Sequence, residues 1–343
     1  MSPHVQIVLL FVGLVATTIA SFFFGGVSIN WSDLASLFSS TPDHQASIQQ
    51  YVLLSVRSPR ILGSIVVGAT LAGGGIALQS LFRNPLADPS IIGISSGASA
   101  FAVFIISMGA TSLALFGLQV GYYTLPVAAF IGALITAIIA YRMSLNNGRA
   151  DMSILLLSGI ALQFMAAALT SLMIFTSNDQ ELRNVTFWMM GSMSNITWTN
   201  ITILALFVMP GFIYYPRIAG KLNKIQLGED QAYSMGVDTQ SLKRKVILVT
   251  TLGIGATVAF CGVVSFIGLV APHIMRLWIG HNHRYLIPAS LIFGGFLNLV
   301  ADTLARTIVL PQELPISIIT AIIGAPVFVT LIIRERKKLA LAQ

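Results

Sequence analysis

The stretch that most constrains the fold runs from Ile61 to Phe82, 22 residues without a charged side chain. At about 1.5 Å per residue, a helix of this length is roughly 33 Å long and can cross the core of a bilayer. The loop RNPLADP follows it, and Pro85 and Pro89 each disfavour helical angles in the residue before them. The sequence therefore predicts a membrane crossing that ends in a sharp turn.

The composition of the chain repeats this pattern. Hydrophobic residues make up 55% of the 343 residues and charged residues only 9%, whereas a soluble domain carries about 25% charged residues. The 19 Lys and Arg are scattered between apolar runs and make no basic face, so no nucleic-acid partner is expected. The single cysteine, Cys261, excludes an intrachain disulfide and a multi-cysteine metal site.

Apolar runs of helix length predict an all-α polytopic membrane protein embedded in the lipid bilayer. We expect ten transmembrane spans, at residues 5–24, 61–82, 91–108, 122–141, 152–176, 198–215, 246–267, 268–280, 286–305 and 315–333. The span at 268–280 is short and contains Pro272. It is retained because its removal would place the basic C-terminal tail outside the membrane.

The distribution of Lys and Arg predicts the orientation. Fifteen of the 19 lie in the segments 83–90, 142–151, 216–245, 276–285 and 334–343. Because positive residues concentrate in cytoplasmic loops, these segments and both termini are expected in the cytoplasm. Four arginines then lie outside or at outer helix ends, namely Arg57, Arg60, Arg183 and Arg306.

The longest segment expected in the cytoplasm, 216–245, contains the sequence LGEDQAYSMGVD. Glu229 and Asp230 suit the first turn of a short helix, and Gly236 suits a left-handed residue after its end. A helix of two turns is marginal alone in water and needs a surface to pack on. Two interpretations stay open at this point: an amphipathic loop on the membrane surface, and a docking element for a cytoplasmic partner.

Ionisable residues within the predicted spans are few. Residues at a spacing of four run along one face of the ninth span, through Gly294, Asn298, Asp302 and Arg306. An ionisable residue in a span is a functional candidate, but Asp302 lies near the outer end, four residues before Arg306. We interpret the two as a structural ion pair rather than as a proton or substrate site. His281 and His283 have no further ligand nearby in sequence, so no metal site is expected.

Five motifs carry a resemblance to a known family. In chain order they are RNPLADPSIIGISSGA, FWMMGSMS, LGEDQAYSMGVD, VVSFIGLVAPHIMR and ELPISIITAIIGAPVFV. From about residue 57 to its end, the chain resembles the FecCD family of ABC-importer permeases, which carry iron–siderophore complexes, haem or cobalamin into bacteria. The resemblance implies one multi-pass permease domain over 1–343, with ten helices and a cytoplasmic coupling segment at 216–245, in the bacterial inner (plasma) membrane. It also implies three kinds of partner: a second permease subunit, identical or homologous, two cytoplasmic ATPase subunits and an extracytoplasmic substrate-binding protein.

The resemblance further implies roles for individual residues. A coupling helix received by the ATPase would contain Gly228, Glu229, Asp230, Ala232, Met235 and Gly236. Acidic residues of the binding protein would dock on three outer arginines, Arg57, Arg60 and Arg306, because guanidinium groups hold carboxylates bidentately. The alternative is that these arginines anchor helix ends at the lipid headgroups. A cytoplasmic gate, or else a rigid loop that positions helices, would be formed by Asn84, Pro85 and Leu86.

The chain is expected to be a transporter subunit without catalytic residues and without a resident cofactor or metal. It contains no G-x-x-x-x-G-K-[ST] motif, so a separate ATPase chain is expected to use ATP and Mg²⁺. The expected cargo is an iron(III)–siderophore complex, with haem or cobalamin as the alternative. The competing class is an ion-coupled secondary transporter. Such proteins usually carry ionisable residues or broken helices near the membrane centre, whereas ionisable residues are few in the predicted spans of this chain.

Overall fold

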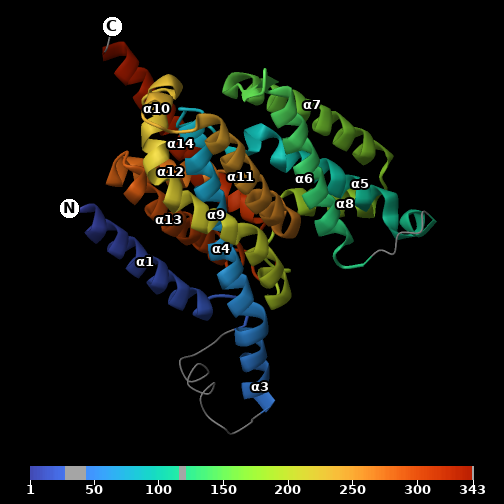
Figure 1. Ribbon diagram of the computed structural model, residues 1–343. Helices are drawn as coiled ribbons and strands as arrows, with labels where there is room; N and C mark the ends of the chain where they lie inside the picture. The colour runs from blue at the N-terminus through green and yellow to red at the C-terminus, as the bar shows by residue number, and fades with distance from the viewer. Residues whose placement is uncertain (28–43, 116–120, 342–343) are drawn as a thin grey trace.

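The structure, a computed structural model, describes residues 1–27, 44–115 and 121–341, and it is almost entirely helical (Figure 1). The helices are α1 (Pro3–Phe23), α3 (His44–Tyr51), α4 (Ser58–Leu81), α5 (Ile94–Leu115), α6 (Thr124–Met143), α7 (Met152–Thr176), α8 (Asp179–Met189), α9 (Trp198–Ile225), α10 (Glu229–Ser234), α11 (Thr239–Cys261), α12 (Ile267–Ile279), α13 (His283–Ala305) and α14 (Ile316–Leu341). A π-helix, η1 (Val52–Arg57), precedes α4, and a 3-10 turn, η2 (Pro89–Ile92), precedes α5. Strands β1 (Leu145–Asn146) and β2 (Arg149–Ala150) form a short antiparallel hairpin between α6 and α7.

Among the described residues, seven helices are long and apolar enough to cross a membrane. Three shorter apolar helices, Ile94–Met108, Ile267–Ile279 and Ile316–Thr330, coincide with three further predicted spans. The all-α fold with many apolar helices is therefore confirmed. Ten crossings and the side on which the termini lie stay predictions.

Helix α4 forms the centre of the molecule, and nearly every one of its residues is buried. Its small residues pack against the predicted stripe on α13, because a Cβ added to Gly68 would lie 2.2 Å from the carbonyl oxygen of Gly294. One turn further along, Asn298 Nδ2 donates a hydrogen bond to the carbonyl of Ser64, at 2.8 Å. Close approach through small residues holds helices together where lipid supplies no hydrophobic drive for association. The stripe on the ninth span therefore serves helix packing.

Two helix boundaries differ from the predicted spans. The helical stretch Ile48–Leu81 continues through Arg57 and Arg60 instead of beginning after them, with η1 as its π-helical part. Helix α9 continues past residue 215, through Pro216, and ends at Ile225. Proline disfavours a helix interior, but α9 keeps burying an apolar face beyond Pro216, with Leu222 fully buried. The segment 216–245 is thus mostly helix, and its connections are short.

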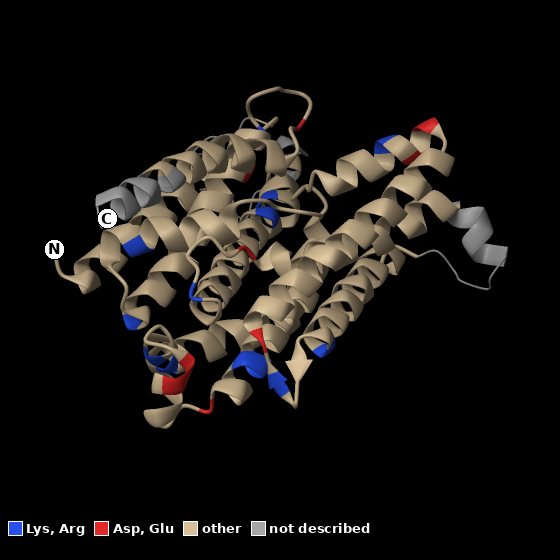
Figure 2. Cartoon of the chain, turned by 90° about the horizontal axis from the view of Figure 1, so that it is seen from above, with Lys and Arg blue, Asp and Glu red and all other residues tan. Residues whose placement is uncertain are grey.

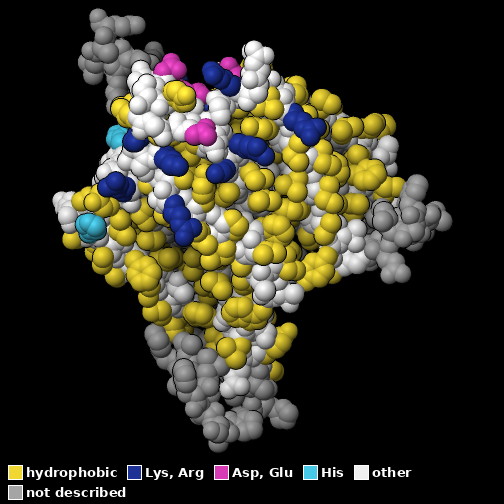
Figure 3. Space-filling view, viewed as in Figure 1, with side chains coloured by type: hydrophobic (Ala, Val, Ile, Leu, Met, Phe, Trp, Pro, Cys, Tyr) yellow, Lys and Arg dark blue, Asp and Glu magenta, His cyan; other side chains and the backbone are white. Residues whose placement is uncertain are grey.

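Charged residues gather at one end of the bundle. Helix α10 and the C-terminal end of the chain lie at that end, and α3 lies at the other (Figure 1). Figure 3 shows Lys, Arg, Asp and Glu grouped there above a largely apolar surface. Seen from above, most of the length of the helices carries no charged residue (Figure 2). This is the pattern expected of a protein whose cytoplasmic end is positively charged.

Candidate functional site

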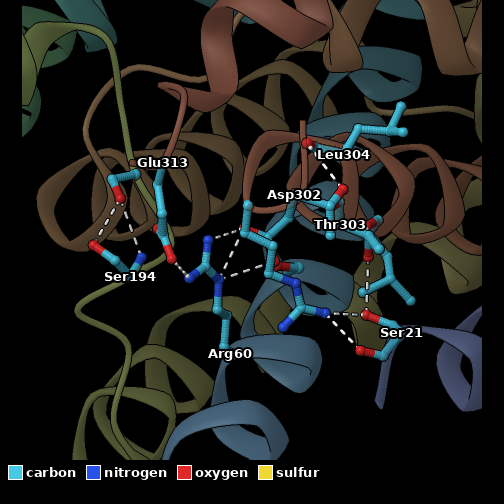
Figure 4. Close-up of polar contacts among 12 residues, drawn as sticks. Ser21, Arg60, Ser194, Asp302, Thr303, Leu304 and Glu313 are labelled. Atoms are coloured by element: carbon cyan, nitrogen blue, oxygen red, sulfur yellow. Dashed lines mark hydrogen bonds and ion pairs between the residues drawn. The ribbon is translucent and has the colours of Figure 1, made fainter. Parts of the chain in front are cut away.

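The buried cluster at the N-terminal end of α4 and the C-terminal end of α13 is centred on Arg60. Its Nη2 lies 2.8 Å from Asp302 Oδ1, and its Nε donates to both oxygens of the same carboxylate. Its Nη1 donates to Glu313 Oε1 at 2.7 Å. Figure 4 shows the guanidinium held between the two acids. The side chain of Asp302 is 1% exposed and that of Glu313 is 40% exposed, so one partner is internal and the other faces outward.

The other two outer arginines connect this cluster to the N-terminal helix. Arg306 donates from Nη2 to the carbonyl and the hydroxyl of Ser21 on α1. Arg57 donates to the backbone carbonyls of Phe22 and Val27. The three arginines thereby join the C-terminal ends of α1 and α13 to the N-terminal end of α4.

The interpretation of Asp302 and Arg306 as an ion pair is wrong. Asp302 pairs with Arg60, 242 residues away in sequence, while Arg306 turns toward Ser21. The reason is the close packing of α4 on α13, which brings the Arg60 guanidinium into direct contact with the carboxylate. The interpretation of Asp302 as a structural residue holds, with a different partner.

Burial bears directly on the predicted docking role of the arginines. Arg57, Arg60 and Arg306 are 4%, 6% and 4% exposed, and each guanidinium is hydrogen-bonded within the chain. Sequence reasoning did not include Glu313, the exposed acid on Arg60. Its position in the motif ELPIS, on a segment expected outside, was the available signal.

The loop RNPLADP makes a compact turn between α4 and η2. Asn84 Oδ1 accepts a hydrogen bond from the N–H of Leu86 at 2.9 Å, and Arg83 adopts a left-handed conformation with φ of 50°. Asp88 caps η2 by accepting from the N–H of Ser90 at 2.8 Å. Burial raises the pKa of the Asp88 carboxyl above its ordinary value, and the Ser90 hydrogen bond opposes this rise. The predicted gate residues thus lie in a loop held by its own side chains.

The predicted coupling helix forms as α10 and ends as the sequence indicated. Glycine at 236 is left-handed, with φ of 81°, and its N–H donates to the carbonyl of Tyr233. The N–H of Val237 donates to the carbonyl of Ala232, which completes a Schellman motif. Ala232 and Val237 are both buried, as the apolar contact of that motif requires. The prediction of a short helix closed by Gly236 is confirmed.

The exposed face of α10 is more apolar than its motif suggested. Asp230 and Gly236 are exposed, and Met235 is 47% exposed. Two neighbours that sequence reasoning did not select, Leu227 and Tyr233, are 62% and 72% exposed. Large apolar side chains in an otherwise polar segment were the signal that could have identified them. Tyr233 on α10, with Leu227 just before the helix and Met235 at its C-cap, gives a set of exposed apolar side chains that suits a protein partner. These three residues are called the apolar patch.

Two cavities lie close to the sites described above, one beside Glu313 and one beside the end of the loop RNPLADP. One, of about 500 Å³, lies beside Glu313 and is lined by Trp188, Ser192 and Ser194. The other, of about 310 Å³, lies between Pro89, Phe266 and Phe328. No group of three or more His, Cys, Asp or Glu side chains able to hold a metal ion is found among the described residues. Apolar side chains make up most of the lining of both cavities, with Asp88 in the smaller one and Glu313 in the larger.

Comparison with known proteins gives one consistent result. The model of the FecCD transport family matches residues 13–334. The hemin transport system permease protein HmuU of Yersinia pestis is 37% identical over 98% of this chain and 97% of its own length. The cobalamin import system permease protein BtuC of Halobacterium salinarum is 39% identical over 85% of this chain and 76% of its own length.

A solved structure agrees with these relatives. It shows an inward-facing conformation of an ABC transporter assigned to the metal-chelate type, and its chain is 31% identical to this one. The two superpose with a TM-score of 0.81 over 96% of this chain and 99% of the other. The whole helical arrangement, and not a single motif, is shared.

Proposed function

Since the chain belongs to the FecCD transport family and is a permease of an ABC importer, we propose that it carries a bulky metal chelate across the inner membrane of a bacterium. Haem is the first candidate for the cargo. The match over nearly the full length of the relative named for hemin transport carries this choice. An iron(III)–siderophore complex is the second candidate, since the solved relative is assigned to metal chelates in general. Cobalamin is the third, because relatives named for it have similar identity.

The energy for transport is proposed to come from two cytoplasmic ATPase subunits that use ATP and Mg²⁺. The apolar patch of Leu227, Tyr233 and Met235, on α10 and at its two ends, supports this, because exposed apolar side chains of this size are typical of a surface that a protein partner covers. The family resemblance supports it as well, because it implies six coupling residues in and beside this helix. Glu229, Asp230 and Ala232 lie in α10, Gly228 and Met235 cap it, and Gly236 follows. In this proposal the chain itself changes conformation during transport, and the ATPase subunits hydrolyse ATP.

A second permease subunit, identical or homologous, is proposed to complete the pathway. Helix α7 lies at the edge of the molecule (Figure 1), and large apolar side chains are exposed along its length. Phe164 is 73% exposed and Phe175 is 87% exposed. These side chains give α7 a long apolar face against which a helix of another subunit can pack.

Docking of an extracytoplasmic binding protein is proposed at the arginine cluster, in a form that its burial restricts. Arg60 can bind a carboxylate of the binding protein only if Glu313 is displaced, because Asp302 occupies the other, buried side of the guanidinium. Glu313 can leave, since its side chain is 40% exposed. The guanidinium groups of Arg57 and Arg306 are hydrogen-bonded to α1. Their proposed part in docking is to hold this end of the bundle in position.

The gate on the cytoplasmic side is proposed to be the loop of Asn84, Pro85 and Leu86. Its support is the compact turn at Asn84 and the position of its end beside the cavity of about 310 Å³. A stiff turn at the end of a cavity can close it without a long movement of the chain.

Uptake in a strain that lacks the chromosomal gene tests the cargo. Cells that express the chain from a plasmid are given radiolabelled haem, a ferric siderophore or cobalamin in separate assays. We expect haem uptake to return only with the plasmid. Restoration of cobalamin uptake alone would overturn the iron-chelate assignment and leave the permease assignment intact.

A further inference from the structure

Lys243 on α11 is a buried lysine that connects the proposed coupling helix to the start of α7. We propose that it is a positioning residue that transmits movement of α10 to the β1–β2 hairpin and so to α7. The inference rests on the proposed role of α10. Lys243 lies five residues beyond the end of the motif LGEDQAYSMGVD, which ends at Asp238.

The contacts of Lys243 join three elements at one nitrogen. Its side chain is 3% exposed, and Nζ lies 2.7 Å and 2.6 Å from the two carboxylate oxygens of Glu229 on α10. The same Nζ donates to the carbonyl of Ala150 on β2 at 2.9 Å. An ammonium group has three donors, so its hydrogen-bonding capacity is directed to the coupling helix and to the hairpin together.

Gln240, one turn earlier on α11, makes a second bridge between the same elements. Its Nε2 donates to Glu229 Oε1 at 2.8 Å, and its Oε1 accepts the N–H of Ala150 at 2.8 Å. Both backbone polar groups of Ala150 are therefore held by side chains that also hold Glu229. A shift of Glu229 cannot leave Ala150 in place without breaking charge-assisted hydrogen bonds.

The hairpin is built to pass such a shift on to α7. Asn147 and Gly148 at its tip have φ of 49° and 76°, the left-handed pair that a tight two-residue turn requires. At its base, the N–H of Asp151 donates to the carbonyl of Ser144 at 2.9 Å. Asp151 then caps α7 by accepting from the N–H of Ser153 at 2.7 Å. One residue separates Ala150 from the first turn of α7.

Further along, α7 is fastened to the segment that follows the proposed gate loop. Gln163 Nε2 donates to the carbonyl of Ser90 at 2.6 Å. A Cβ added to Gly159 would lie 1.9 Å from the carbonyl oxygen of Ile91, so the two backbones are in direct contact. A continuous line of contacts thus runs from α10 through Lys243, the hairpin and α7 to η2. These contacts carry movement from α10 to α7 only if breaking them changes the coupling between ATP hydrolysis and transport, and this change can be measured.

Replacement by methionine tests the assignment, since Lys243→Met keeps the length of the buried stem. The chain is well suited to a matched control, Lys245→Met, which removes the same charge from an exposed position two residues away. Both variants are reconstituted with the ATPase and the binding protein in proteoliposomes, and labelled haem imported per ATP hydrolysed is measured. We expect Lys243→Met to lower this ratio by roughly tenfold, with ATP hydrolysis within about twofold of wild type, and Lys245→Met to leave it unchanged.

A distance measurement gives a readout that needs no cargo and that simple destabilisation does not produce. Spin labels are placed at Asn147→Cys on the hairpin tip and Ser234→Cys on α10, since the native Cys261 is buried. The distance between the labels is expected to stay constant on ATP binding when Lys243 is present and to change or broaden with Lys243→Met. A wild-type distance in the variant, in both nucleotide states, would overturn the proposal.

A separate experiment distinguishes failure of the proposed docking of α10 on the ATPase from failure of the proposed role of Lys243. A cross-link between Tyr233→Cys and the ATPase in the wild-type background tests whether α10 docks at all. Its absence would overturn the role of α10 and with it the basis of the inference. Its presence together with unchanged coupling in Lys243→Met would overturn the inference alone.

Discussion

The guanidinium of Arg60 and the carboxylate of Asp302 form a buried ion pair, with Nη2 and Oδ1 2.8 Å apart, that fastens α4 to α13. The pair joins two helices whose small-residue faces, at Gly68 and Gly294, are in direct contact. Glu313 adds a second carboxylate from the connection between α13 and α14. The arginine cluster is therefore first an internal clamp, and Arg60 becomes available to a partner only when the exposed acid, Glu313, leaves it.

Loss of the inner carboxylate is expected to destabilise the fold. Asp302→Asn leaves a buried guanidinium with one exposed partner, and removing one member of a buried ion pair costs about 3–5 kcal/mol. Thermal unfolding of the purified protein in detergent measures the effect as a fall in Tm. Asp230→Asn, an exposed acid on α10, is the control and is expected to cost less than about 1 kcal/mol. Equal Tm values for the two variants would contradict the clamp.

Tight packing of α4 on α13 predicts opposite effects of one substitution at two glycines. In Gly68→Ala the new Cβ would meet the backbone of Gly294, and the helices must separate, at a cost of roughly 1–3 kcal/mol. Gly220→Ala in α9 meets open space and should be neutral or stabilising by up to about 1 kcal/mol, because alanine favours a helix. Unfolding temperatures of the two purified variants provide the comparison. A Gly68→Ala protein as stable as Gly220→Ala would show that the helices are not in close contact.

Removal of the exposed acid on Arg60 should strengthen docking of the binding protein. Glu313→Gln frees one side of the guanidinium for an external carboxylate, and the affinity is expected to rise by about 3- to 10-fold, a typical effect of one charge contact at an interface. Surface plasmon resonance on the permease in nanodiscs measures it. Asp179→Asn, a neutralised acid on α8 that is not among the partners of Arg60, should change the affinity little. Weaker binding with Glu313→Gln would mean that Glu313 itself is a contact.

The apolar patch of α10 predicts which side chains hold the ATPase. Tyr233→Ser removes a side chain that is 72% exposed on α10, and about tenfold less ATPase is expected to co-purify, as for a central aromatic contact of an interface. Tyr51→Ser removes a comparably exposed tyrosine on α3 at the opposite end and should leave co-purification unchanged. An equal loss in both variants, or in neither, would refute docking on this patch.

Local features of the structure followed from the sequence. The apolar runs predicted the helices, because length and lack of charge alone decide whether a segment can span a bilayer. The end of α10 at Gly236 was also predictable, since a left-handed residue after a short helix favours glycine. The packing role of the stripe through Gly294 and Asn298 was not predicted, because the stripe was interpreted through its charged residues, Asp302 and Arg306.

Long-range pairings could not be predicted in the same way. The partner of Asp302 was expected four residues away, at Arg306, because sequence spacing shows only neighbours on one helix, whereas Arg60 comes from α4. Lys243 was counted as one of many cytoplasmic charges, and its burial arises from the hairpin and α10 folding over it. The extension of α9 past Pro216 depends on tertiary packing that local proline chemistry does not contain.

ATP-driven uptake is the most direct test of the account. The permease is reconstituted in liposomes with its ATPase and binding protein, and entry of labelled haem is followed with ATP and Mg²⁺ on the cytoplasmic face. We expect uptake that requires ATP, stops when the ATPase subunit is omitted and is unaffected when ion gradients are collapsed. Uptake that an ion gradient drives without ATP would contradict the account and assign the chain to secondary transport.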